Sequence, residues 1–533
     1  MRRLRAGAPA LGALASGLAV WAAFPPVGLW WAAPLGVAGL LVLTAGRGPA
    51  VGAGLGAVFG LGLFTPLLHF IAVAMGNSVG WAALVLVESA YLAALGAAWA
   101  LVRRLGVLTG DHAGKAWARV LAFTVLWCAV EELRSSWPLG GFPFGRLAFA
   151  MAQAPVLPVA AYGGSLGLSA VVVVVAACLV EVVGALRRRR PRLVVALAAT
   201  ASALLLAPAA LPVPTGAQDG TLRVGAVQGN VATDFEDAFG RALEVTGNHA
   251  EATHQLAAEV GTGTLDVVIW PENSADLDPR THLASAALVD EAAEAVGAPV
   301  LVGAVAFEDD VRYNDIVVWS AGTGPGEYYR KHRPVPFAEY VPFRSLVRAV
   351  TAQADRIGTD MAAGTGPQTL TVRAATQDRE VTVAMGICFE VAYDEVLREG
   401  VAQGGQVIVI PTNNASFLSS SEAAQQLAQG QVQAVVHGRA VVQVSTVGIT
   451  AIISPAGEVL QATRPYTSAS LVADVPLRRT TNLADRLGAA PGVLAQAGGA
   501  VLVAAGIVEA ARRSRGRSRR GSRRADRTER EHQ

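Results

Sequence analysis

Charged residues are scarce in this chain of 533 amino acids. Only 16% of its residues are charged, against about 25% in an ordinary soluble protein, while 52% are hydrophobic. The mean hydropathy is correspondingly high, at +0.41. This composition excludes a wholly water-soluble protein and indicates that much of the chain lies in lipid.

Cysteine is equally scarce, and the three present exclude a disulfide framework. Cys128 and Cys178 lie in long apolar segments, which leaves Cys388 as the one thiol placed for chemistry. The eight histidines form no zinc-type pattern with one another or with cysteine, so we expect no metal. No glycine-rich phosphate loop follows a strand, and we expect no cofactor.

Long apolar stretches dominate the first two hundred residues and return near residue 500. A helix needs ~20 residues to cross a bilayer, and eight stretches come near that length. They lie at roughly 8–24, 27–45, 50–74, 79–102, 117–133, 159–186, 193–211 and 489–510. We therefore expect an N-terminal membrane domain of about seven helices over residues 1–212 and a C-terminal transmembrane helix over 489–510. A signal peptide would explain only the extreme N-terminus.

Clusters of arginine and lysine separate these stretches. They occur at residues 2–5, 47, 103–119, 187–192 and 512–530. With eight crossings every cluster falls on one side, which the positive-inside rule assigns to the cytoplasm. The polar region at 220–485 is then extracytoplasmic. We expect the basic tail at 511–533 to lie in the cytoplasm and to touch anionic lipid rather than nucleic acid.

The polar region alternates between strands and helices after a linker at 212–220 that is rich in proline and glycine. Strands are expected at 222–227, 266–270, 299–305, 316–320, 381–387, 406–410, 441–445, 449–454 and 459–463, and helices at 234–260, 281–296, 391–402 and 421–437. Such alternation predicts a layered α/β domain.

Three strand ends in this region carry residues suited to catalysis. Glu272 follows an apolar strand, where a carboxylate can take a proton from a thiol. Lys331 precedes a loop rich in proline and aromatics and offers a fixed positive charge to an oxyanion. Cys388 ends an apolar, β-branched run, a position typical of a nucleophile. Taken singly, each also fits a structural role: a surface acid, a solvated charge and a buried thiol.

Taken together and in this order, these three residues resemble the Glu-Lys-Cys triad of the nitrilase superfamily. The run at 224–230 (VGAVQGN) looks like the first strand of that superfamily. Combined with the membrane spans, the chain resembles the apolipoprotein N-acyltransferase family. The run at 335–342 (VPFAEYVP) is close to the family's Val-Pro-Phe-Gly-Glu-Tyr-Val-Pro, and residues 131–134 with 141–143 resemble its membrane loop.

The resemblance implies a multi-pass α-helical membrane domain and an extracytoplasmic nitrilase-like domain, an α-β-β-α sandwich. It implies that a membrane phospholipid donates an acyl group through a Cys388 thioester to a diacylglyceryl-modified apolipoprotein. Glu339 and Glu390 match acidic positions of the family's site, and we expect them to orient the lysine and the loop at the cysteine. Tyr340 and Phe389 are expected to face lipid or to pack that loop. The oligomeric state stays open.

Two other functions fit the same residues. A membrane-tethered amidase or nitrilase would hydrolyse a small extracellular amide with the same triad, although a tether does not need about seven spans. A non-catalytic scaffold would use the nitrilase-like domain to bind a partner glycosyltransferase, and the intact triad argues against it.

Overall fold

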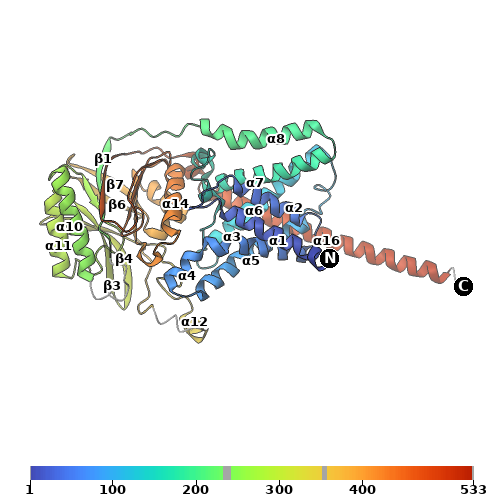
Figure 1. Cartoon of the computed structure of the whole chain (residues 1–533), viewed down its shortest axis with the longest axis horizontal. Coiled ribbons are helices and arrows are strands. Elements are labelled where there is room, and N and C mark those ends of the chain that lie inside the picture. Colours follow the sequence, from blue (N-terminus) through green and yellow to red (C-terminus); the bar gives the residue numbers. More distant parts are fainter. Residues whose placement is uncertain (1, 232–241, 351–356, 531–533) are drawn as a thin grey trace.

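A helical bundle and a two-sheet α/β domain lie at opposite ends of the molecule (Figure 1). The computed structural model describes residues 2–231, 242–350 and 357–530. The bundle helices are α1 (Arg2–Trp21), α2 (Ala32–Thr44), α3 (Pro49–Leu67), α4 (His69–Met75), α5 (Val79–Val102), α6 (Ala113–Ser136), α7 (Ala160–Arg187), α8 (Pro191–Leu206) and α16 (Ala490–Arg530).

Glycines allow the central helices of the bundle to approach closely. A Cβ added to Gly52 on α3 would lie 2.4 Å from the carbonyl oxygen of Gly96 on α5, and one added to Gly96 would lie 2.1 Å from that of Gly52. Small residues at such a crossing let two backbones touch, which is a common way of packing helices in lipid.

Six of the described helices are long and apolar enough to cross a membrane, by length and composition. They cover Pro49–Leu67, Val79–Val102, Ala113–Ser136, Leu157–Arg187, Pro191–Ala210 and Ala490–Arg515, and two shorter apolar helices cover Gly7–Trp21 and Ala32–Thr44. The stretch at 50–74 is not one helix: it breaks at Leu68, where α3 ends and α4 begins. Eight crossings therefore stay a prediction.

The α/β domain contains two six-stranded sheets, with strand orders β12-β1-β2-β3-β4-β5 and β11-β10-β9-β8-β7-β6. The first sheet consists of β1 (Thr221–Gln228), β2 (Val267–Ile269), β3 (Val300–Glu308), β4 (Val311–Ser320), β5 (Gly324–Arg330) and β12 (Ala469–Pro476). The second consists of β6 (Thr369–Ala374), β7 (Arg379–Met385), β8 (Val407–Thr412), β9 (Val441–Ser445), β10 (Ala451–Ile453) and β11 (Val459–Ala462).

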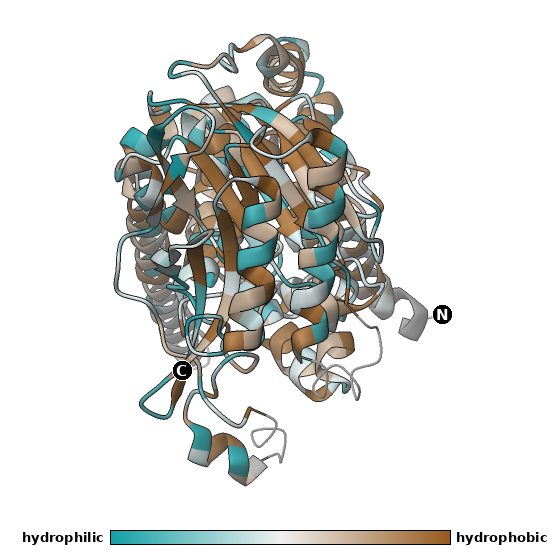
Figure 2. Ribbon diagram, turned by 90° about the vertical axis from the view of Figure 1, so that its left-hand side faces the viewer, coloured by the Kyte–Doolittle hydropathy of each residue, from teal (hydrophilic) through white to brown (hydrophobic). Residues whose placement is uncertain are grey.

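These elements form four layers, as the α-β-β-α expectation requires. Side chains of both sheets share one buried core, so the sheets face each other. Helices α10 (Ala242–Val260) and α11 (Leu283–Val296) cover the outer face of the first sheet, while α13 (Asp394–Ala402) and α14 (Glu422–His437) cover that of the second. Figure 2 shows hydrophobic strands behind helices whose outward turns are hydrophilic.

The structure corrects several of the expected elements. β7 ends at Met385, and Cys388 opens a short 3₁₀ helix, η6 (Cys388–Ala392), so the helix expected from 391 begins only at Asp394. Three strands were not predicted: β5, β6 and β12. All three are edge strands, and β5 is mostly exposed and has few apolar residues, so it lacks the apolar pattern that marks a strand. Residues 234–241 of the helix expected at 234–260 lie outside the described residues.

Candidate active site

Cys388 lies just beyond β7, where the chain leaves the second sheet. It is 9% exposed, and its backbone adopts a left-handed conformation with φ of 53°. A residue with a side chain rarely adopts this conformation, and such strain is concentrated at functional sites. The Gln426 side chain of α14 donates from Nε2 to the sulfur over 3.8 Å.

Glu272 follows β2 of the first sheet and is 3% exposed. Its Oε1 accepts from the Lys331 Nζ at 3.1 Å and from the Asn314 Nδ2 at 2.5 Å, and its Oε2 accepts from the backbone N–H of Asn413 at 2.8 Å. The carboxylate is therefore held by groups from both sheets.

Lys331 follows β5 and is 1% exposed. Burial alone would lower its pKa, but the carboxylates of Glu272 and Glu339 outweigh burial and hold the pKa well above its ordinary value. Burial raises the pKa of the Cys388 thiol, Glu272 raises it further, and Lys331 opposes both. The surroundings of Cys388 thus favour its protonated form.

Two further acids hold the loops around this cluster. Glu339 accepts from the Lys331 Nζ at 2.7 Å and from the Val335 N–H at 2.7 Å. Glu390 is fully buried and accepts four hydrogen bonds at 2.7–2.8 Å, from the hydroxyl of Tyr329 and from the N–H groups of His332, Arg333 and Ile387. Glu390 therefore ties the lysine loop to the residue before the thiol.

Replacing Glu390 with glutamine is expected to lower the free energy of unfolding by about 2–4 kcal/mol, because hydrogen bonds to a charged group contribute about 1.5–3 kcal/mol each. The NH₂ group of the glutamine would face these donors and could not accept hydrogen bonds from them. Tyr329→Phe is the matched control, since it removes one of the four donors and leaves the carboxylate in place. Thermal unfolding of the purified variants measures the difference. Equal loss in both would contradict the argument.

The two aromatic candidates differ in their surroundings. Phe389 is 8% exposed and stacks on Phe144 of the bundle, with ring centroids 5.3 Å apart and planes at 8°. It therefore packs the loop at Cys388 onto the loop between α6 and α7. Tyr340 is half-buried, and its carbonyl accepts from the N–H of Phe337 at 2.7 Å.

Sequence reasoning missed four residues of the site. Asn314 and Asn413 bind Glu272, Gln426 contacts the thiol, and Glu422 is buried beside them on α14. The sequence signal was weak: two asparagines after the apolar run at 406–410, and a glutamine-rich helix. Among the described residues no group of three or more His, Cys, Asp or Glu side chains could hold a metal ion.

The buried carboxyl group of Glu422 is expected to make the stability of the protein depend on pH. Burial raises its pKa from 4.5 to about 8, against the hydrogen bond from Asn414. Since folding favours the protonated acid, its stabilising contribution is complete below about pH 4.5 and is lost as the pH rises through about 8. Glu422→Gln keeps an oxygen that can accept from Asn414 and removes the titration. Unfolding temperatures measured from pH 5 to 9 should fall less in the variant; parallel curves would contradict the assignment.

Two family models match the chain. The model described as the apolipoprotein N-acyltransferase N-terminal domain matches residues 16–178, and the carbon-nitrogen hydrolase model matches residues 223–485. The apolipoprotein N-acyltransferase of Mycolicibacterium smegmatis is 35% identical over 93% of this chain and 85% of its own length. That of Azotobacter vinelandii is 31% identical over 87% of this chain and 88% of its own length.

Among solved structures, an amidase from Nesterenkonia sp. aligns with 50% of this chain and 95% of its own, at 14% identity and a TM-score of 0.36. The six long apolar helices and the relatives agree on a membrane protein. Because a relative above 30% identity is matched over nearly the whole chain, and both family models fall in the expected order, the chain belongs to the apolipoprotein N-acyltransferase family.

Proposed function

We propose that this protein transfers a fatty acyl group from a membrane phospholipid to the α-amino group of the N-terminal diacylglyceryl-cysteine of apolipoproteins. The acyl group is carried as a thioester on Cys388. The observation that carries this proposal is the buried cluster of Glu272, Lys331 and Cys388 at the junction with the membrane bundle. Family membership over the length of the chain supports it.

In the first half-reaction Glu272 takes the proton of Cys388, and the thiolate attacks the ester carbonyl of the phospholipid. Lys331 stabilises the oxyanion of the tetrahedral intermediate. The intermediate collapses, the ester C–O bond breaks, and the proton passes from Glu272 to the departing oxygen. A lysophospholipid leaves, and the acyl group remains on the sulfur.

In the second half-reaction the free α-amino group of the lipoprotein attacks the thioester carbonyl. Lys331 stabilises the second oxyanion, and Glu272 accepts a proton from the attacking nitrogen. The C–S bond breaks, the thiolate is reprotonated, and the product is an amide. Glu339 and Glu390 act on this chemistry through the positions of Lys331 and of the loop at Cys388.

Contacts with the bundle support an active site that excludes bulk water, which a thioester needs to survive. The Gln425 side chain donates to the carbonyl of Leu67 at 3.1 Å, and the Tyr393 hydroxyl donates to the carbonyl of Gly141 at 3.0 Å. The ring of Phe417 lies 5.6 Å from that of Phe70 on α4. Segments around the thiol thus rest on the helical bundle.

We further propose that the α/β domain lies on the extracytoplasmic side. Basic residues of three segments meet at one place: Arg104 donates to the carbonyl of Arg47 at 3.4 Å, and Arg513 donates to that of Arg104 at 2.6 Å. The α7–α8 junction lies at the end of the bundle away from the α/β domain (Figure 1). A basic end opposite the catalytic domain supports a cytoplasmic assignment for that end.

Intact-mass analysis tests the proposed reaction. Protein purified from membranes and incubated with phospholipid should carry an added fatty-acyl mass that hydroxylamine removes. The Cys388→Ala variant, treated in parallel, should carry none. Absence of the adduct from the unmodified protein would contradict a thioester from lipid and favour the hydrolase or the scaffold.

A further inference from the structure

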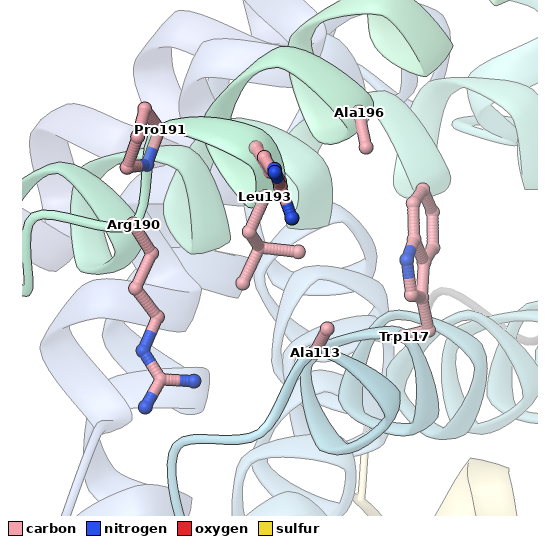
Figure 3. A pocket seen from close by; sticks show the side chains of 7 residues that line it. Ala113, Trp117, Arg190, Pro191, Leu193 and Ala196 are labelled. Carbon is pink, nitrogen blue, oxygen red and sulfur yellow. The ribbon is translucent and has the colours of Figure 1, made fainter.

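A cavity lies between the start of α6 and the start of α8, at the end of the bundle away from the α/β domain (Figures 1 and 3). Its volume is about 490 Å³, and it is lined by Ala113, Trp117, Arg190, Pro191, Arg192, Leu193 and Ala196. Figure 3 shows Trp117 of α6 facing Leu193 and Ala196 of α8. Five lining residues are apolar or aromatic and two are arginines, so the cavity combines an apolar wall with positive charge.

Helix α8 leaves this cavity accessible from the surrounding lipid. Only 17% of the apolar part of α8 is buried, against 44% to 56% of the corresponding parts of α3, α5, α6 and α7. It packs mainly on α7 and stands apart from the rest of the bundle (Figure 1). The gap at α6 is therefore not closed by another helix of the described chain.

The surroundings of the cavity are strongly basic. The segments 111–119 and 181–192 carry seven lysines and arginines and only two acids. Both acids already have partners: Asp111 pairs with Arg188 at 3.1 Å, and Glu181 accepts from the Arg119 Nε at 2.7 Å. The excess positive charge in this corner has no counter-charge from its own segments.

The two arginines of the lining differ in their engagement. Arg190 is half-buried and donates from Nη1 to the carbonyl of Asp111, a neutral acceptor. The Arg192 side chain makes no hydrogen bond or ion pair with any residue that the structure describes. Both guanidinium groups therefore keep donors for an anion, and Arg binds phosphate oxygens through such donors.

We propose that this cavity binds an anionic phospholipid from the leaflet at the basic end of the bundle. Its phosphate lies between Arg190 and Arg192, and an acyl chain runs along Leu193 and Ala196 beside Trp117. The occupant is not the acyl donor of the catalytic cycle, because Cys388 lies at the other end of the bundle. Basic pockets between membrane helices are suited to such headgroups.

Lipid retention by the full-length protein tests the site. Protein in mixed micelles containing equal amounts of phosphatidylglycerol and phosphatidylcholine with identical chains should retain the anionic lipid about tenfold more in native mass spectra. Arg190→Gln combined with Arg192→Gln should remove this preference. Arg187→Gln combined with Arg189→Gln is the matched control, because it removes the same charge from the same hairpin outside the cavity and should keep the preference.

A second pair of variants tests the space inside the cavity without changing its charge. Ala196→Trp fills the lining and should lower retention, whereas Ala198→Trp on the same helix, outside the lining, should not. If both arginine variants lost the preference for the anionic lipid equally, that preference would come from the overall positive charge of the surface, and the proposal would be overturned. Full retention in Ala196→Trp would also overturn it. Such retention, together with displacement of the lipid by millimolar inorganic phosphate, would show a phosphate site without an acyl site.

Discussion

Replacing Cys388 with alanine is expected to abolish acyl transfer while the protein stays folded. Loss of a nucleophile that acts as a unit with its base costs about 10⁶ in kcat, which puts the variant below detection in any turnover assay. The fold should persist, because alanine keeps the Cβ and loses only the sulfur, which accepts a long hydrogen bond of 3.8 Å from Gln426. Turnover with a lipopeptide acceptor and the unfolding temperature measure the two effects.

Two other replacements sharpen this test. Cys388→Ser should fold and stall, because a carboxylate base generates an alkoxide far less readily than a thiolate. Cys388→Gly should be equally inactive and at least as stable as Cys388→Ala, since glycine adopts φ of 53° without strain. Acyl transfer by the alanine variant would disprove the covalent mechanism. If the glycine variant were less stable than the alanine variant, the claim that the backbone is strained at Cys388 would be contradicted.

Removing the charge of Lys331 is expected to have the second-largest effect. Loss of one oxyanion donor costs about 10²–10³ in kcat. Lys331→Met also leaves the buried Glu272 and the partly buried Glu339 without their cation, which costs about 3–5 kcal/mol of stability. Lower turnover by folded protein, measured at a temperature well below unfolding, separates the first effect from the second.

The reactivity of the thiol distinguishes a catalytic role for Lys331 from a purely structural one. Lys331 lowers the pKa of Cys388 and Glu272 raises it. Lys331→Met should therefore shift the pH dependence of Cys388 alkylation upward, whereas Glu272→Gln should shift it downward. Turnover should fall in both, because the second variant lacks the base. Shifts in the same direction would contradict this electrostatic arrangement.

Two of the three main candidates, Glu272 and Cys388, could be predicted because each follows a recognisable strand, whereas Lys331 follows β5, which was not predicted. Glu272 comes just after the apolar run that forms β2, and Cys388 comes after that of β7, so their places beyond the ends of these strands follow from local pattern. The detail at the thiol could not be predicted. Its 3₁₀ turn depends on the carboxylate of Glu390 accepting from the N–H of Ile387, a contact that a strand pattern does not encode.

The residues that hold Glu272 could not be predicted for a similar reason. Asn314 lies on β4 of the first sheet, and Asn413 follows β8 of the second. They meet the same carboxylate only because the two sheets face each other. The edge strand β5 was missed because it is exposed over most of its length and its sequence, GPGEYYR, has no apolar alternation.

By itself, the sequence determined the apolar segments, the layered α/β domain and the order of the acid, the lysine and the thiol. These depend on hydropathy, periodicity and short motifs, which act over a few neighbouring residues. Only the tertiary structure decided that Lys331 is buried between two carboxylates, that Phe389 stacks on the bundle, and that α8 leaves a basic cavity beside α6. Each of these depends on segments that are distant in the chain and are brought together only by packing.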